Sequence, residues 1–107
     1  MKYKITIITP TFNSERTIAH NIESVKNQDY KKYEHLIIDN KSSDKTLEII
    51  NKNIYENIKV YSDKDEGIYD AINKGINFSS GEIISVLHSD DFFFDNKVLS
   101  ILNLLFN

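Results

Sequence analysis

Four short apolar runs, separated by stretches with helical spacing, constrain the fold of this chain more than any other feature. The runs cover residues 5–8, 34–38, 58–61 and 83–87, and their length and β-branched content predict strands. Apolar residues three to four positions apart predict helices at about 14–28, 44–50, 67–78 and 98–106. Strands joined by helical crossovers imply an α/β fold, with a parallel sheet covered by helices on both faces. We predict the strand order 3-2-1-4, with the third strand near an edge and the fourth strand buried.

The boundaries of these elements follow from turn and capping residues. Ser14 is the predicted N-cap of the first helix, and either Ser43 or Asp44 is the predicted N-cap of the second. The first strand is expected to stop at Thr9-Pro10-Thr11, because proline cannot donate to a sheet. The last helix is more apolar than a free surface helix, so we expect it to pack on the sheet and to leave an exposed patch.

Size and composition exclude several classes of protein. A chain of 107 residues is expected to form one domain, residues 1–107, and 40% hydrophobic residues suffice for a core. The absence of cysteine excludes disulfides, thiolate catalysis and cysteine-ligated zinc. A net charge of −3 with scattered positive residues predicts no nucleic-acid partner. No apolar run approaches the roughly 18 residues that span a bilayer, and the N-terminus lacks signal-peptide features, so we expect a cytoplasmic location.

Polar residues gather where three of the predicted strands end. They are Thr9 to Asn13 after the first strand, Asp39-Asn40 after the second, and His88 to Asp91 after the fourth. The carboxyl ends of parallel strands meet at one edge of the sheet, where ligands bind in open α/β folds. Each segment taken alone is equally compatible with a solvated turn or a helix cap. Three of them on one edge favour a binding site.

The residue types at this edge limit the ligand. None of the three glycines builds a phosphate-binding loop after the first strand, so backbone amides are not the main phosphate cradle. The adjacent carboxylates of Asp90 and Asp91 suit a hard cation, Mg²⁺ or Mn²⁺, that would hold a diphosphate. Phe12 offers a flat face for a base, and Asp39 could accept a hydrogen bond from a ring N–H or a hydroxyl. The structural alternatives are core packing for Phe12 and turn capping for Asp39.

Four segments in this order resemble the family-two glycosyltransferases. They are Ile7 to Asn13, Ile37 to Thr46, Gly67 to Gly75, and Ser89-Asp90-Asp91. The resemblance implies a Rossmann-like sheet of the GT-A type and transfer, with inversion, of a sugar from a nucleotide-diphosphate donor, most simply a UDP-sugar. It also implies a glycan or lipid-linked acceptor, as in bacterial surface polysaccharide or cell-wall synthesis. A peripheral association with the inner face of the membrane and an oligomeric state are compatible with it.

The resemblance also implies roles for individual positions. Asp90 would hold the ribose hydroxyls, and Asp91 would bind the Mn²⁺ or Mg²⁺ that bridges the diphosphate. Asp39 would contact the base or the ribose. The remaining positions implied in nucleotide-sugar binding are Thr9, Pro10, Phe12 and Asn13, around the nucleobase, and Asp70 and Lys74, near the sugar or phosphates.

Three departures from the family pattern affect these expectations. Asn40 stands where many relatives have a second acidic residue, which leaves the identity of the base less constrained. Ile72 stands where many have arginine, so phosphate contacts must come from elsewhere. The third departure is length, because relatives continue for at least as many residues again. No residue matches the general base that an inverting transfer needs. We therefore interpret the chain as the nucleotide-sugar-binding half, with the base and the acceptor site outside it. His88 is expected to pack or to bond in a turn, and His20 and His35 are expected on the surface.

Other functions remain open on the sequence alone. One is a nucleotide-binding or partner-binding module that is catalytically incomplete. A sugar nucleotidyltransferase favours a loop rich in glycine and arginine after the first strand, which this chain lacks. A phosphorelay receiver has its acidic pair after the first strand, whereas here the pair follows the fourth.

Overall fold

Four parallel strands form the centre of the structure, a computed structural model that describes residues 2–107. The strands and helices alternate in the order β1 (Ile5–Thr11), α1 (Ile18–Lys26), β2 (Tyr33–Asp39), α2 (Thr46–Lys52), β3 (Ile58–Ser62), α3 (Ile68–Phe78), β4 (Ile83–Val86) and α4 (Val98–Leu105). In the sheet they lie in the order β3-β2-β1-β4, and every neighbouring pair is parallel. The α/β class and the strand order predicted from the sequence are confirmed.

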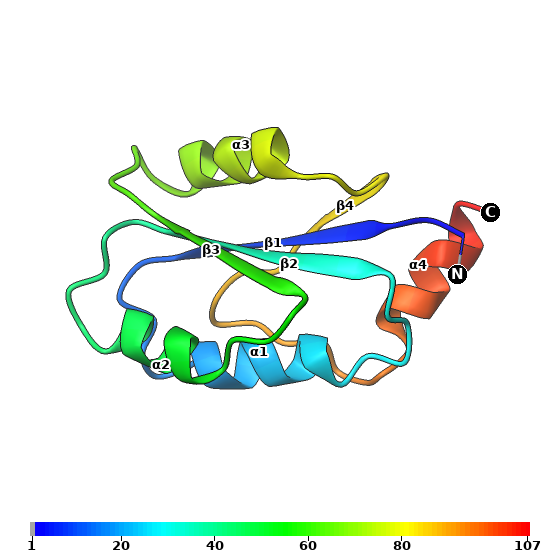
Figure 1. Ribbon diagram of the computed structural model, residues 1–107, viewed down its shortest axis with the longest axis horizontal. Coiled ribbons are helices and arrows are strands. Elements are labelled where there is room, and N and C mark those ends of the chain that lie inside the picture. Colours follow the sequence, from blue (N-terminus) through cyan, green and yellow to red (C-terminus); the bar gives the residue numbers. More distant parts are fainter. Residues whose placement is uncertain (1) are drawn as a thin grey trace.

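The helices cover both faces of the sheet, as predicted (Figure 1). Helix α3 lies on one face, α1 and α2 lie on the other, and α4 lies at the end of the sheet near the two chain termini. The connection from β3 returns across the sheet to β4, so the strand order reverses between β1 and β4. This reversal is the topological switch point, where open α/β sheets leave a crevice at the carboxyl ends of the strands.

Strand β1 is longer than predicted and includes Pro10. Leu87 N–H donates to the carbonyl of Ile8, so the backbone polar groups of Ile8 point toward β4. In a parallel strand alternate residues bond to the same neighbour, so Pro10 also faces the β4 side. The pairing of β1 with β4 ends at Val86, opposite Ile8. Because no strand lies opposite Pro10 on that side, its missing N–H costs no ladder bond, and β1 continues to Thr11.

Apolar side chains of β1, β2 and the helices form the core. All seven residues of β1 and all seven of β2 are buried. Helix α1 contributes the residues predicted from its spacing, Ile18, Ile22 and Val25. On the other face, a Cβ at Gly75 would lie 2.6 Å from Ile8 Cγ2. Glycine at this position therefore lets α3 lie close against β1.

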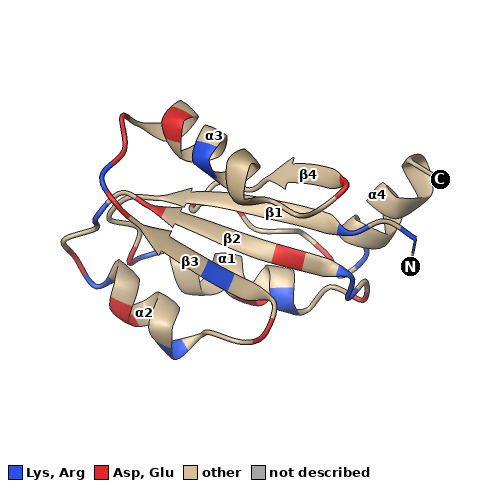
Figure 2. Cartoon of the chain, turned by 45° about the horizontal axis from the view of Figure 1, so that its top comes forward, with Lys and Arg blue, Asp and Glu red and all other residues tan. Residues whose placement is uncertain are grey.

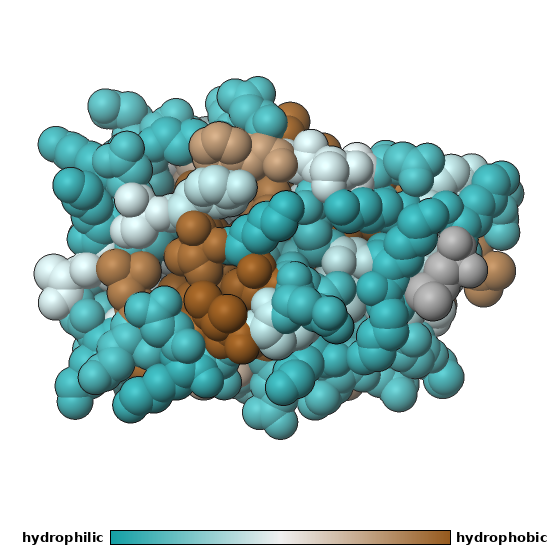
Figure 3. All heavy atoms as spheres, viewed as in Figure 1, coloured by the Kyte–Doolittle hydropathy of each residue, from teal (hydrophilic) through white to brown (hydrophobic). Residues whose placement is uncertain are grey.

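The edge strands of the sheet also expose apolar side chains. Strand β4 was predicted to be buried, but Ile84 is 41% exposed and Val86 39% exposed, so that prediction was wrong. The reason is topological, because β4 pairs only with β1 and is an edge strand. Figure 3 shows apolar side chains that also reach the surface between β3 and α2, among polar ones. Acidic and basic residues are interspersed over the strands, helices and loops (Figure 2).

Helix α4 packs at the amino-terminal end of the sheet, with Leu102 against the core cluster and Leu99 inside it. Leu99 is fully buried in a cluster with Ile5, Val25 and Tyr30. The other side of the helix presents Leu104 and Leu105 to solvent. Both the predicted packing and the predicted exposed patch are present.

His35 lies in the core, which corrects the surface position expected for it. It is fully buried in β2, and its Nε2 lies 2.8 Å from the hydroxyl of Thr9 on the neighbouring strand. Burial lowers the pKa of His35 from 6.5 to about 3, so the imidazole is neutral. The short apolar run that holds this residue forms a strand that is buried on both faces. A polar residue within such a strand is therefore buried as well, whichever face it points to. His20 is exposed, as expected.

Candidate active site

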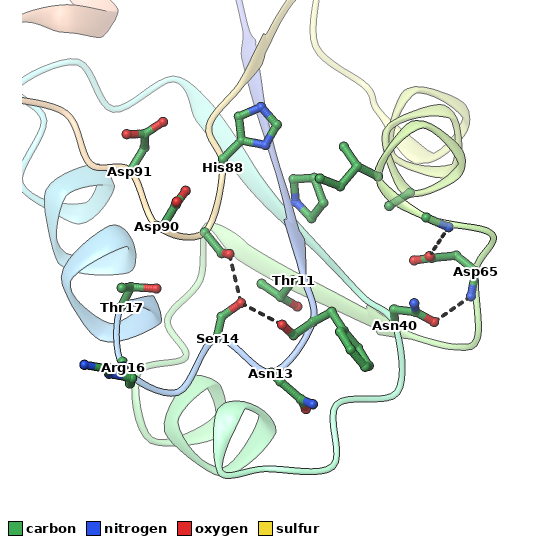
Figure 4. A pocket seen from close by; sticks show the side chains of 16 residues that line it. Thr11, Asn13, Ser14, Arg16, Thr17, Asn40, Asp65, His88, Asp90 and Asp91 are labelled. Atoms are coloured by element: carbon green, nitrogen blue, oxygen red, sulfur yellow. Dashed lines mark hydrogen bonds between the residues drawn. The ribbon is translucent and has the colours of Figure 1, made fainter.

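A cavity of about 840 Å³ opens at the carboxyl ends of the strands, at the switch point between β1 and β4 (Figure 4). Four chain segments line it: the end of β1 with the loop into α1, the residue after β2, the loop that enters α3, and the turn after β4. The lining residues are Pro10 to Ser14, Arg16, Thr17, Asn40, Asp65, Gly67, Ile68, Ala71 and His88 to Asp91. The structure therefore brings together the polar strand ends that the sequence predicted to meet.

The acidic pair lies on the turn after β4 and faces this cavity. Asp90 and Asp91 are both exposed, and within residues 2–107 neither carboxylate has a hydrogen-bond partner. The hydroxyl of Ser14 donates to Ser89 Oγ at 2.8 Å, which ties the turn to the loop after β1. Ser14 was predicted to cap α1, but the helix begins three residues later, after Thr17, and no side chain caps it. The hydroxyl of Ser14 is instead directed at Ser89 (Figure 4).

The loop after β1 places an aromatic ring in the cavity. Phe12 is 59% exposed and lines the cavity, so it does not pack in the core. Asn13 adopts a left-handed backbone conformation with φ of 48°. Its Oδ1 accepts hydrogen bonds from the amides of Ser43, at 2.9 Å, and Asp44, at 3.3 Å. The side chain of Asn13 therefore fastens this loop to the loop after β2.

The loop after β2 is also held at the start of α2. Helix α2 begins at Thr46 with Lys45 at its N-cap position, so the prediction of Ser43 or Asp44 as the N-cap was wrong. Asp44 Oδ1 does accept a hydrogen bond from the Thr46 amide at 2.9 Å, which stabilises this end of the helix. Partial desolvation of the Asp44 carboxyl acts to raise its pKa. Hydrogen bonds from Thr46 and from the Glu15 amide outweigh that effect and hold the pKa below its ordinary value.

Asp39 lies beneath the cavity rather than in its lining. It is fully buried, and it accepts hydrogen bonds from the hydroxyls of Thr11, Ser42 and Ser62 and from the amide of Ser42. Each carboxylate oxygen thus accepts two hydrogen bonds. The residue that follows it, Asn40, lines the cavity.

Three other residues proposed from the sequence also lie outside the lining. Thr9 is buried and bonded to His35. Asp70 and Lys74 form an ion pair with each other on α3, with 3.6 Å between Oδ2 and Nζ. Lys74 Nζ also donates to the carbonyl of Lys64. The pair lies on the side of α3 next to the one that Ile68 and Ala71 turn to the cavity.

The structure adds two cavity residues that the sequence did not single out. Asp65 is 9% exposed, its amide donates to Asn40 Oδ1 at 2.8 Å, and its Oδ1 accepts from the amide of Gly67 at 2.8 Å. It follows the carboxyl end of β3, so the rule that selected the other three strand ends would have selected it too. Arg16, the only arginine of the chain, lines the cavity at the start of α1.

The residues at the acidic end of the cavity fit a hard divalent cation. Within residues 2–107 no three His, Cys, Asp or Glu side chains converge as a complete metal site. Mg²⁺ and Mn²⁺ do not require one, because they take one or two carboxylates together with water and phosphate oxygens. Asp90 and Asp91 provide two carboxylates of that kind.

Fold and site define a class, a parallel α/β domain whose crevice at the switch point is lined by an aromatic ring and an acidic pair. The model of the glycosyl transferase family 2 matches residues 6–107, and the chain belongs to this family.

Known members of the family resemble the chain over most of its length. A dolichyl N-acetyl-α-D-glucosaminyl phosphate glucuronosyltransferase of Methanococcus voltae is 43% identical over 88 residues, which are 77% of this chain and 27% of that protein. A PGL/p-HBAD biosynthesis glycosyltransferase of Mycobacterium bovis is 31% identical over 88% of this chain and 38% of its own length. The chain thus spans about a quarter to two fifths of these relatives.

A solved structure agrees with the fold. TarS of S. aureus in complex with UDP-GlcNAc superposes with a TM-score of 0.86 at 28% identity, over 94% of this chain and 30% of that one. Within residues 2–107 no helix is long and apolar enough to cross a bilayer.

Proposed function

We propose that this chain binds the nucleoside-diphosphate sugar for an inverting glycosyltransferase. The observation that carries the proposal is a single cavity lined both by Phe12 and by the unpaired carboxylates of Asp90 and Asp91. Its volume of about 840 Å³ is in the range of small-molecule sites. TarS, at 28% identity, is known with UDP-GlcNAc, which supports a uridine nucleotide as the donor.

The nucleobase would lie at the end of the cavity formed by Pro10, Phe12 and Asn13. Asn40 and Asp65 lie on the same side and are bonded to each other through the Asp65 amide. That bond leaves the amide nitrogen of Asn40 as a donor and one oxygen of Asp65 as an acceptor. Uracil presents carbonyl oxygens beside a ring N–H, so a donor and an acceptor are what it requires. Asp39 lies beneath this end of the cavity and would support it through its hydrogen bonds to Thr11, Ser42 and Ser62.

The diphosphate would lie at the opposite end, near Asp91 and Arg16. A bound Mn²⁺ or Mg²⁺ would supply Lewis-acid stabilisation of the charge on the departing nucleoside diphosphate. Asp91 would hold that ion, and Asp90 would accept hydrogen bonds from the ribose hydroxyls. The guanidinium of Arg16 can donate hydrogen bonds to phosphate oxygens. Arg16 would thus take the place of the arginine that many relatives have at the position of Ile72.

Asp70 and Lys74 would contribute near the sugar. Both are partly exposed, and their ion pair is a solvent-accessible one that costs little to rearrange. Their neighbours Ile68 and Ala71 on α3 already line the cavity, so a change of rotamer would bring Lys74 toward a bound phosphate or sugar hydroxyl.

The transfer step needs groups beyond those in the cavity. A base must take the proton of the acceptor hydroxyl as its oxygen attacks the anomeric carbon and the bond to the diphosphate breaks. We assign this base, and the binding of a glycan or lipid-linked acceptor, to a part of the protein outside residues 1–107. The relatives that act on dolichyl phosphate sugars or in PGL biosynthesis support an acceptor of that kind. A cytoplasmic location at the inner face of the membrane belongs to the same proposal.

Isothermal titration of UDP tests the donor site. We expect binding to be markedly tighter with Mn²⁺ than with a chelator, and Asp91→Asn to remove that difference while the unfolding midpoint is unchanged. Asp95→Asn is the matched control, because it is an exposed carboxylate of the same loop outside the cavity lining. Equal binding with and without metal would count against the proposal. Sugar transfer by residues 1–107 alone would contradict the assignment of the base.

A further inference from the structure

Helix α1 and the turn after it carry three polar side chains that bond to the backbone between β4 and the start of α4. Asn21 and Ser24 are three positions apart on one side of α1, and Gln28 follows two residues after the helix ends. Gln28 donates to the carbonyl of Asp95 at 2.6 Å and accepts from the amide of Leu99 at 3.1 Å. Ser24 Oγ accepts from the amide of Phe93 at 3.1 Å. This row of side chains therefore holds the whole segment that follows the acidic pair.

Asn21 is the member of the row that reaches the acidic turn. Its Nδ2 donates to the carbonyl of His88 at 2.9 Å and to the carbonyl of Asp91 at 3.1 Å. The amide of Asp91 donates to the same His88 carbonyl at 3.0 Å, which closes a four-residue turn. Asn21 thus binds both ends of the turn that carries Asp90 and Asp91.

The burial of Asn21 indicates that the two bonds from its amide nitrogen are what favours asparagine at this position. The side chain is fully buried, and its Oδ1 has no hydrogen-bond partner within residues 2–107. A buried, unpaired carbonyl oxygen costs free energy, so an apolar side chain would be favoured here if the amide nitrogen did no work. The orientation of the amide is unambiguous, because carbonyl oxygens only accept and must face the nitrogen.

We propose that Asn21 is the positioning residue of the donor site, and that it acts by fixing the backbone of the His88–Asp91 turn so that the two carboxylates face the cavity. The inference rests on the proposed function. Adjacent carboxylates repel each other, and an unsupported turn would relax so as to separate them. Because Asn21 bonds only to backbone carbonyls, it leaves both carboxylates free for the cation and the ribose. A residue that orients metal ligands in this way changes metal affinity by about 10- to 100-fold.

The test compares Asn21→Ala with Ser24→Ala, since both remove bonds from α1 to the same segment. Two readouts are needed: UDP affinity with Mn²⁺ and with a chelator, and hydrogen exchange of individual backbone amides. We expect Asn21→Ala to weaken the Mn²⁺-dependent binding of UDP by about 10- to 100-fold and to leave binding in chelator within about twofold. The Asp91 amide should exchange at least about tenfold faster. Ser24→Ala should speed exchange at Phe93 and leave the Mn²⁺ dependence unchanged.

Three results would overturn the inference. They are unchanged exchange at Asp91 in Asn21→Ala, an equal loss of UDP binding with and without Mn²⁺, and failure to fold of both Asn21→Ala and Asn21→Ser. Asn21→Ser keeps a single donor and should be intermediate. If the unsubstituted protein shows no metal-dependent binding, the proposed function fails by itself. Exchange at Asp91 then still decides whether Asn21 holds the turn.

Discussion

Thr11 and Asp39 lie opposite each other in β1 and β2, and the Thr11 hydroxyl donates a 2.7 Å hydrogen bond to Asp39 Oδ1. Both residues are buried, Thr11 in the lining of the candidate donor site and Asp39 beneath it. With the two bonds from Ser42 and the one from Ser62, this pair connects the ends of β1, β2 and β3. The positions of Phe12 and Asn40, one residue further along their strands, depend on it.

Asp39→Asn should therefore destabilise the protein. The amide nitrogen of asparagine cannot accept, so two of the four donors that point at residue 39 lose their acceptor. We expect the free energy of unfolding to fall by about 2–3 kcal/mol, measured by urea denaturation. Asp63→Asn, at an exposed aspartate just after β3, is the control and should change stability by less than about 0.5 kcal/mol. Equal stabilities of the two variants would contradict the structural role of Asp39.

Arg16→Ala should weaken nucleotide binding only where phosphate is present. Arg16 lines the cavity and is the only arginine in the chain. We expect the affinity for UDP to fall by about tenfold and the affinity for uridine to stay the same, as measured by calorimetry. Lys52→Ala removes an exposed charge on α2 outside the cavity lining and should leave both affinities unchanged. A comparable loss for uridine would place Arg16 at the base instead.

His35 should make the protein sensitive to acid. Burial holds its pKa in the folded protein at about 3, compared with 6.5 ordinarily, so between these values the unfolded chain binds a proton that the folded chain does not. This contribution to stability is complete above pH 6.5 and is lost as the pH falls toward 3. The slope reaches about 1.4 kcal/mol per pH unit.

Urea denaturation at pH 7, 6 and 5 measures this effect. His35→Gln keeps a polar side chain that can bond to Thr9 but does not titrate, so its stability should change less over the same interval. Parallel losses of stability in the two proteins would show that other groups cause the acid sensitivity. His20→Gln, at the exposed histidine of α1, serves as the matched control.

Gly75→Ala should destabilise the contact between α3 and β1. Alanine favours a helix over glycine by about 1 kcal/mol, which by itself would stabilise α3. The new methyl would, however, lie 2.6 Å from Ile8 Cγ2, a methyl group on a β-branched side chain with little freedom to rotate. Overpacking of this kind costs about 1–3 kcal/mol, so we expect a lower thermal midpoint. In an Ile8→Ala background, which lacks Cγ2, the same Gly75→Ala substitution should cost less than in the unsubstituted protein, and an equal cost in both backgrounds would exclude the steric explanation.

Much of the architecture followed from the spacing of apolar residues. The runs at 5–8 and 34–38 lie within β1 and β2, and Ile18, Ile22 and Val25 are buried on α1 as their period predicted. Helical crossovers made the sheet parallel, and a parallel sheet brings the ends of its strands to one edge. The meeting of Phe12, Asn40 and Asp91 in one cavity was therefore predictable. Local periodicity and chain connectivity are sufficient for this much, because both are properties of the sequence.

Other features depended on which neighbour each residue meets in three dimensions. Pro10 continues a strand because β4 ends before it. His35 is buried because both faces of β2 are covered. Asp39 and Asn40 look alike as polar residues at a strand end, yet one is enclosed by hydroxyls and the other faces the cavity.

The amino-acid sequence alone was enough to predict the order of elements, the parallel sheet and the edge at which a ligand would bind. The tertiary structure alone decided which polar groups at that edge are free and which are used to hold the loops. The bond from Asn21 to the turn 67 residues further along the chain is the clearest case. The physical reason is that hydrogen bonds form between groups that are close together in the folded chain. The spacing of residues along the sequence does not give those distances.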